Sequence, residues 1–163
     1  MILYHGGTET IERPEIIIPA TARDFGIGFY TTNIIDQAIR WAKRKSRTTS
    51  RPGHQRPAIV NLYDFDESAL SILKVNTFPE ASSDWLDMVV ACRSDVYHKH
   101  GYDIVTGKIA DDNVGETILY VLQNIMRRED AIERLRFEQI NHQICFCSKE
   151  SLQYLNFLEA RTY

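Results

Sequence analysis

The chain has 163 residues, of which 44% are hydrophobic and 25% charged, and its formal net charge is −3. These values predict one soluble globular domain and exclude a disordered, fibrous or repeat protein. No apolar run approaches the ~18 residues of a membrane-spanning helix, and Met1–His5 has neither the basic nor the apolar region of a secretory signal. The odd number of cysteines (Cys92, Cys145 and Cys147) excludes a disulfide framework, so we expect a cytoplasmic protein.

Basic residues are concentrated in one segment. Between Arg40 and Arg56 seven side chains are basic and none is acidic, which leaves 12 basic and 22 acidic residues in the rest of the chain. Two interpretations fit this pattern. The segment is either a solvated helix end that continues into a loop, or an element that faces the phosphates of a nucleotide or a nucleic acid.

In chain order, the first residues predict short strands separated by glycine turns. Ile2–His5 is an apolar strand that ends at Gly6 and Gly7, and Ile16–Ile18 predicts a second extended segment. Asp24–Thr32 contains two glycines followed by an aromatic pair. This pattern predicts a tight turn that leads into a short strand.

A helix is predicted to begin near Ile34, because apolar residues recur from there at helical spacing. Thr32 or Asn33 is its expected N-cap, and the basic residues suit its C-terminal end. Residues 46–57 are rich in Ser, Thr, Arg, Gly and Pro, so we predict a basic, mobile loop there.

The second half of the chain predicts helices and strands in irregular order. The expected elements are a strand at 58–65, a short helix at 66–73, a helix capped by Ser82 or Ser83, a strand at 102–107, helices at 113–127 and 130–138, a strand at 142–147, a short helix at 149–155 and an extended segment from Phe157. Because strands and helices do not alternate, we predict a single α+β domain over residues 1–163, with a mixed, mostly antiparallel sheet.

Conventional catalytic and cofactor motifs are absent. The chain has no dinucleotide fingerprint, phosphate-binding loop, nucleophile elbow or zinc-protease motif. Cys92 with His98 and His100, or His142 with the two late cysteines, lack a recognised zinc spacing, so no metal site is expected.

What remains is a polar residue on each of three short strands: His5, Tyr30 and Gln143. Strand alternation places Gln143 on one face with Cys145, and Ile144 on the other. A glutamine on a buried strand face needs hydrogen-bond partners, so its presence there is costly unless it serves a site.

These residues stand in segments that resemble a known superfamily. Leu3–Gly7 resembles the first motif of the ADP-ribosyltransferases of the diphtheria-toxin and poly(ADP-ribose) polymerase type, and Phe25–Thr32 followed by Asp36–Ala42 resembles the second. The chain is more closely similar to a bacterial family of unknown function that is grouped with these transferases, over about residues 2–158, including Asp103–Asp112 and Gln143–Phe146. The resemblance implies split mixed and antiparallel sheets flanked by helices.

The resemblance also implies NAD as the substrate and a role for each residue. His5 would hydrogen-bond the adenine-side ribose, and Gly6 would offer its backbone N–H and C=O to the nicotinamide carboxamide, which a side chain there would obstruct. Tyr30 would stack on the nicotinamide ring, and Gln143 would take the third position of the H-Y-E triad and contact the other ribose. The other residues implied at NAD are Gly7, Thr8, Asp24, Phe25 and Gly28.

The chain departs from the family pattern at two positions. Gly7 stands where many polymerase-type enzymes have Ser or Thr, a hydroxyl that Thr8 could replace. Gln143 stands in place of Glu, and an amide cannot act as a base at neutral pH. A single transfer is therefore expected rather than polymer elongation.

Other carboxylates are candidates for the base that activates the acceptor. They are Glu138, Asp111 and Asp112, although the two aspartates equally suit a helix cap. Asp24 likewise has two interpretations, as a turn residue or as part of the rim of the site.

The resemblance therefore implies a mono-ADP-ribosyltransferase that cleaves the nicotinamide glycosidic bond of NAD and transfers ADP-ribose to a macromolecule, either protein or nucleic acid. An NAD glycohydrolase and a non-catalytic module that binds NAD or ADP-ribose are the alternatives. The family further implies a bacterial toxin or defence effector, neutralised by an antitoxin protein. No metal and no membrane partner are expected.

Overall fold

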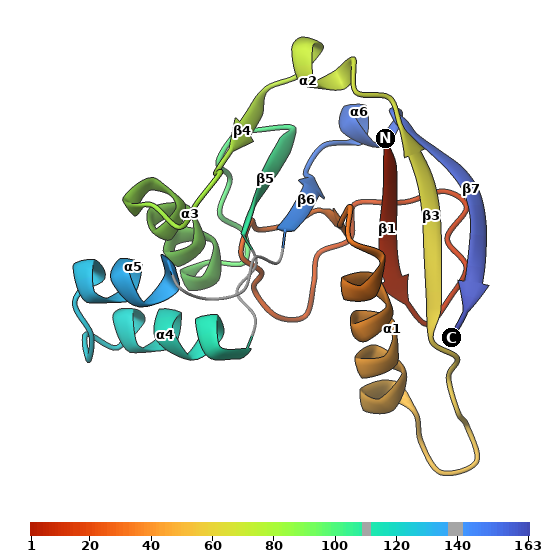
Figure 1. Ribbon diagram of the computed structural model, residues 1–163, viewed down its shortest axis with the longest axis horizontal. Coiled ribbons are helices and arrows are strands. Elements are labelled where there is room, and N and C mark those ends of the chain that lie inside the picture. The colour runs from red at the N-terminus through yellow and green to blue at the C-terminus, as the bar shows by residue number, and fades with distance from the viewer. Residues whose placement is uncertain (109–111, 137–141) are drawn as a thin grey trace.

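Two β-sheets and the helices that cover them make up the fold (Figure 1). The computed structural model describes residues 1–108, 112–136 and 142–163. The strands are β1 (Ile2–Gly7), β2 (Phe29–Thr31), β3 (Ile59–Phe65), β4 (Val75–Thr77), β5 (Ile104–Lys108), β6 (His142–Phe146) and β7 (Leu155–Thr162). The helices are α1 (Ile35–Thr49), α2 (Ala69–Ile72), α3 (Ser83–Ser94), α4 (Asp112–Leu122), α5 (Arg128–Arg136) and α6 (Lys149–Leu152).

The two sheets differ in how their strands pair. In the first sheet β3 lies between β1 and β7, and both pairs are antiparallel. The second sheet has the order β2-β6-β5-β4, in which β4 runs parallel to β5 and the other pairs are antiparallel. The predicted α+β class, with mixed and mostly antiparallel pairing, is therefore confirmed.

One apolar layer joins the inner faces of the two sheets. Ile144 and Phe146 of β6 lie in it together with Leu3 of β1 and Phe65 of β3. The rings of Phe65 and Phe146 meet edge to face, with their centroids 5.2 Å apart. Cys145, which stands between the two β6 residues, belongs to the apolar cluster on the opposite face. The alternation predicted for this strand is confirmed.

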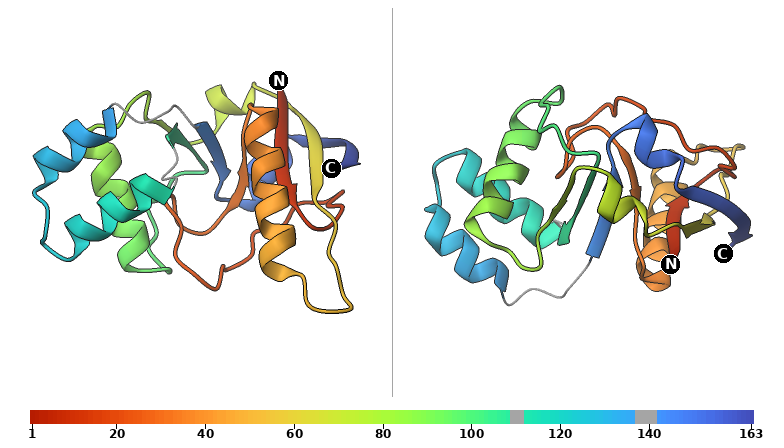
Figure 2. Two further views of the ribbon diagram at one scale, coloured as in Figure 1. Left: turned by 60° about the horizontal axis from the view of Figure 1, so that its bottom comes forward. Right: turned by 90° about the horizontal axis from the view of Figure 1, so that it is seen from above.

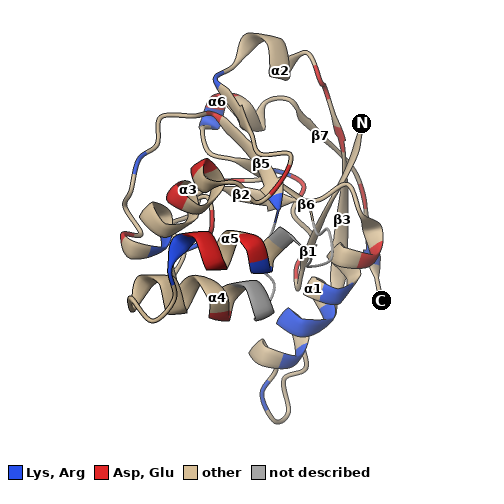
Figure 3. Ribbon diagram, turned by 60° about the vertical axis from the view of Figure 1, so that its left-hand side comes forward, with Lys and Arg blue, Asp and Glu red and all other residues tan. Residues whose placement is uncertain are grey.

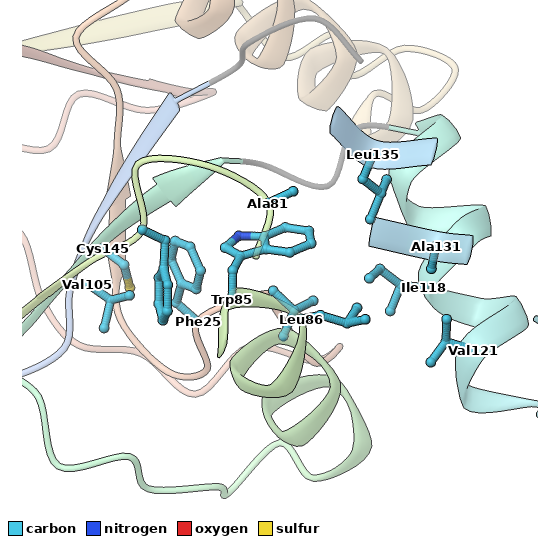
Figure 4. Packing of buried hydrophobic residues seen from close by; sticks show 12 residues of the cluster. Phe25, Ala81, Trp85, Leu86, Val105, Ile118, Val121, Ala131, Leu135 and Cys145 are labelled. Carbon is cyan, nitrogen blue, oxygen red and sulfur yellow. The ribbon is translucent and has the colours of Figure 1, made fainter. Parts of the chain in front are cut away.

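Helices cover the outer faces of both sheets. α1 packs on β1 and β3 through Ala38 and Ala42. α3, α4 and α5 form a second helical layer around Trp85 (Figure 4). Ser82 caps α3, as predicted, by accepting a hydrogen bond of 3.2 Å from the Trp85 N–H. As a result, β2 and β6 lie between α1 and the three-helix layer (Figures 1 and 2).

Two predictions in the first part of the chain are wrong. Ile16–Ile18 form no strand, and the side chains of Ile17 and Ile18 are exposed. A strand needs a neighbouring strand for its backbone hydrogen bonds, and no described strand pairs with this segment. The N-cap of α1 is Ile34 rather than Thr32 or Asn33, because the backbone of Thr32 is already paired with Tyr4 across to β1.

Two helix boundaries and one strand also differ from the prediction. α1 continues to Thr49, so only the second part of the predicted 46–57 loop is non-helical. α4 ends at Leu122, and Asn124 follows with a φ of 57°, a left-handed conformation that breaks the helix. The strand β4 was not predicted, because three residues are too few to show a strand period.

Candidate functional site

The ladder between β1 and β2 consists of a single residue pair. Tyr4 and Thr32 exchange two backbone hydrogen bonds, of 2.8 and 2.9 Å. A continued antiparallel ladder would next pair Gly6 with Tyr30. Instead, the His5 Nδ1–H donates to the Tyr30 carbonyl at 2.7 Å. The strands therefore separate here, and we call this place the strand split.

Gly6 has its backbone N–H and C=O on the open edge of β1 at the strand split. Backbone groups of alternate residues in a strand point the same way, and those of Tyr4 point to Thr32. The groups of Gly6 therefore point to the same edge, beyond the place where β2 leaves it. Across the described ranges of the chain, nothing forms a hydrogen bond with them. A donor and an acceptor of this buried residue therefore lie side by side at the edge.

The side chain that Gly6 lacks would point to α1 rather than to the open edge. A Cβ atom built there would lie 2.2 Å from the Ala38 oxygen and 2.9 Å from the Ala42 nitrogen. Such distances are far inside van der Waals contact. The expected reason for glycine, clearance for a ligand, is therefore corrected: the close approach of α1 to β1 requires it.

His5 is half-buried and neutral at physiological pH. Its ring stacks on Phe29, with centroids 4.5 Å apart. Burial lowers the pKa of His5 to about 4, although the hydrogen bond to Tyr30 opposes this shift. Because Nδ1 carries the proton in that bond, Nε2 has a free lone pair and is a hydrogen-bond acceptor. Nε2 lies at the end of β1, where a Cβ atom at Gly7 would be 3.4 Å away.

Two hydrogen bonds hold the hydroxyl of Tyr30. Its hydroxyl donates to the Gly26 carbonyl at 2.6 Å and accepts from the Phe25 N–H at 3.3 Å. Burial raises the pKa of Tyr30 well above its ordinary value, so the phenol stays protonated. Gly26 has a φ of 73°, which a turn of this shape needs and glycine supplies without strain. The predicted glycine turn therefore fixes the orientation of the half-buried tyrosine.

Gly28, Phe25 and Asp24 support this turn from within the protein. A Cβ atom at Gly28 would lie 2.4 Å from the Cys145 Sγ, so glycine there lets β6 approach. The Phe25 side chain is fully buried in the three-helix cluster. The Asp24 carboxylate forms a buried ion pair with Arg93 of α3, at 2.6 Å. These three residues, expected at NAD, occupy positions that hold the turn.

The Asp24–Arg93 ion pair is expected to be important for stability. Arg93→Met removes the cation that faces the Asp24 carboxylate, whose side chain is only 7% exposed. We expect the free energy of unfolding to fall by about 3 kcal/mol. Urea denaturation measures the change. Arg127→Met is the matched control, because its ion pair with Asp130 is exposed, and it should cost less than about 1 kcal/mol. Equal effects of the two substitutions would contradict the proposed contribution of the Asp24–Arg93 ion pair to stability.

Gln143 lies on the same face of the second sheet as Tyr30. Tyr30 pairs with Cys145 on β6, and Gln143 is two residues further along that strand. Such diagonal neighbours are about 7 Å apart. The side chain of Gln143 is 3% exposed, and its amide nitrogen is a buried donor with no hydrogen-bond partner among the described residues. The glutamine is therefore on a buried strand face, and the unpaired donor is a cost that a bound ligand would remove.

Gln37 of α1 is a further buried polar residue beside β6, and no pattern in the sequence predicted its place there. Its amide nitrogen donates to the His142 carbonyl at 3.2 Å, while its oxygen is buried and has no partner in the described part of the chain. Nδ1 of His142 is also buried and unpaired within the residues that the structure describes. The signal in the sequence was weak: Gln37 directly precedes Ala38 on the buried stripe of the helix. Trp41 follows one turn later on the same side and is half-buried.

The remaining candidates are not all at the strand split. The hydroxyl of Thr8, which is 6% exposed, accepts a hydrogen bond of 3.4 Å from Arg56 on the loop after α1. Asp111 and Glu138 lie outside the described residues, as does the side chain of Asp112. Of the described candidates, His5, Gly6 and Tyr30 lie at the strand split, and Gln143 lies on β6 two residues beyond the partner of Tyr30.

A family model for DUF3990 matches residues 1–157, a range that includes every residue of the strand split. The chain belongs to the DUF3990 family. This family is described as proteins of unknown function. No curated protein and no solved structure matches the chain. In the described part of this DUF3990 chain, no helix is long and apolar enough to cross a membrane.

Proposed function

We propose that this DUF3990 protein is an NAD-dependent mono-ADP-ribosyltransferase with its active site at the strand split. The observation that carries the proposal is the unpaired N–H and C=O of Gly6, which His5 and Tyr30 border. A primary carboxamide has one carbonyl and one NH₂ group, so it complements this donor and acceptor with two hydrogen bonds. Nicotinamide carries such a group. Two sheets that separate beside it support an ADP-ribosyltransferase-like fold.

The neighbouring side chains supply the other contacts that NAD requires. The Nε2 lone pair of His5 accepts a hydrogen bond from a ribose hydroxyl. The Tyr30 ring, fixed through its hydroxyl, packs against the nicotinamide ring. The amide of Gln143 binds the second ribose, which gives its unpaired donor a partner.

The reaction breaks the bond between the nicotinamide nitrogen and the ribose C1′. The electron pair of that bond goes to nicotinamide, which leaves neutral, while the ribose develops oxocarbenium character. The acceptor then forms a bond to C1′ and loses a proton to water. The protein fixes the leaving ring and places the Gln143 oxygen near the electron-poor sugar, so it acts by orientation and electrostatics. An amide removes no proton, which suits a single transfer.

Labelled NAD tests the proposal. The pure protein is incubated with NAD labelled in its adenylate part, alone and with a cell lysate, and both free nicotinamide and retained label are measured. Label on macromolecules together with nicotinamide release is the expected result. Nicotinamide release without retained label would replace the proposal by an NAD glycohydrolase. Neither product from the folded protein would reduce the site to a binding module.

Gln143→Met separates a ligand-binding role from a structural one. Methionine has a similar volume and removes the unpaired donor, so we expect the free energy of unfolding to be unchanged or about 1 kcal/mol higher. Nicotinamide release should fall at least about tenfold, because the ribose loses a contact. Denaturant titration and an NAD turnover assay measure the two effects. A destabilised but fully active variant would show that Gln143 is a structural residue.

A further inference from the structure

One group of exposed basic residues lies along α1 and the loop that follows it (Figure 3). We call it the basic face, and it consists of Arg40, Lys43, Arg44, Lys45 and Arg47 on α1 and Arg51 and Arg56 on the loop that leads to β3. All seven side chains are exposed, and no acidic residue lies between the first and the last. The basic face carries a strong positive potential on a chain that is otherwise acidic.

The spacing of these residues differs from that of an ordinary solvated helix. Arg40, Lys43 and Arg47 recur every three or four positions, so one cation follows another at about 5 Å along the helix. The only acidic residue of α1 is Asp36, in its first turn. A solvated helix usually mixes charges of both signs. Within the described ranges of the chain, neither Lys43 nor Arg47 forms an ion pair, so both are available to an anion.

The basic face also adjoins the strand split. Arg56 donates to the Thr8 hydroxyl and forms a 3.1 Å ion pair with Glu9, and these two residues directly follow Gly7 at the end of β1. The charge of Lys45 acts on the His5 ring, in addition to the effect of burial. An anion bound along α1 therefore comes close to the end of β1 where His5 Nε2 lies.

We propose that the basic face binds a nucleic acid, and that this nucleic acid is the acceptor of ADP-ribose. The acceptor role rests on the proposed function, whereas the binding itself does not. The pyrophosphate of NAD needs only one or two cations, whereas the basic face extends over two helical turns and a loop, as a phosphodiester backbone requires. In the transfer, a base amino group or a hydroxyl of the nucleic acid bonds to C1′, nicotinamide leaves with the electron pair, and a proton goes to water.

A charge-reversal pair tests the binding. Lys43→Glu/Arg47→Glu is compared with Lys74→Glu/Lys99→Glu, which changes the net charge equally at exposed positions outside the basic face. Anisotropy with fluorescent single-stranded RNA, single-stranded DNA and duplex DNA measures affinity at several salt concentrations, and shows which nucleic acid is preferred. We expect the first variant to bind at least about tenfold more weakly and to lower the slope of log affinity against log salt by about 1.4 on single strands. Equal losses in both variants would overturn the proposal.

The labelling reaction tests the acceptor role with the same variants. We expect nuclease-sensitive label, and the nicotinamide released with it, to fall at least tenfold in Lys43→Glu/Arg47→Glu, while the KM for NAD stays within about twofold. A raised KM with unchanged oligonucleotide binding would assign the basic face to the NAD pyrophosphate instead. Protease-sensitive label of equal amount in both variants would also overturn the proposal. If the wild type binds oligonucleotides but releases no nicotinamide, the proposed function fails while the nucleic-acid surface stands.

Discussion

Replacing His5 with asparagine is expected to leave the protein folded and to reduce nicotinamide release at least about a hundredfold. The asparagine amide reaches the position of Nδ1, so it can still donate to the Tyr30 carbonyl and keep the strand split in place. It has no acceptor at the position of Nε2, so the ribose hydroxyl loses its partner. An NAD turnover assay, together with a denaturation curve, measures both properties.

His5→Ala is the control that removes both contacts, and it should lose stability as well as activity. A folded His5→Asn protein with wild-type turnover would contradict a role of Nε2 in binding the ribose. The pH dependence gives a second readout. The pKa of folded His5 is about 4, below the 6.5 of an unperturbed histidine, so the unfolded chain binds more protons between these values. Stability therefore falls as the pH decreases from about 6.5 to 4, and less steeply in His5→Asn.

Gly6→Ala is expected to lower the free energy of unfolding by about 3 kcal/mol or more, and Gly7→Ala by less than about 1 kcal/mol. A methyl group on Gly6 would overlap the Ala38 carbonyl in the backbone of α1, and a helix can give way only by moving as a whole. A methyl group on Gly7 makes an ordinary contact with the His5 ring. The two neighbouring glycines thus form a matched pair, which urea denaturation compares directly.

The substitutions Gly6→Ala and Gly7→Ala also separate an effect on stability from an effect on activity. Gly7→Ala should stay folded, but its methyl group covers His5 Nε2, so nicotinamide release should fall about tenfold. Two results would contradict this account. One is a stable Gly6→Ala protein, which would mean that α1 does not approach β1 so closely. The other is an equally unstable Gly7→Ala protein.

Local patterns predicted most of the elements and the three polar strand residues of the site. His5 precedes a glycine pair, Tyr30 follows a glycine turn, and alternation along six residues predicted that Gln143 shares a face with Cys145. Each of these signals lies within a few positions of the chain. They concern the conformation of one strand or turn, which is what neighbouring residues determine.

Features that depend on distant segments could not be predicted. Asp24 and Arg93 are 69 positions apart, and nothing near either residue indicates that they form an ion pair. Gln37 became part of the site only because α1 lies beside the start of β6. For Gly6, the sequence indicated a special backbone position, but the reason, the Ala38 carbonyl, depends on packing between a helix and a strand. Local propensity carries no information of this kind.

Under the proposed function, the open edge of Gly6 limits how ligand binding can change, either in evolution or under selection by an inhibitor. Its two contact groups belong to the main chain, so almost any residue at that position would still carry them, and only proline would remove the donor. Side-chain substitutions can disturb the packing beneath the edge, but they cannot redesign the contact itself. A compound that presents a primary carboxamide to this edge would therefore meet an interaction that point mutations have little means of escaping.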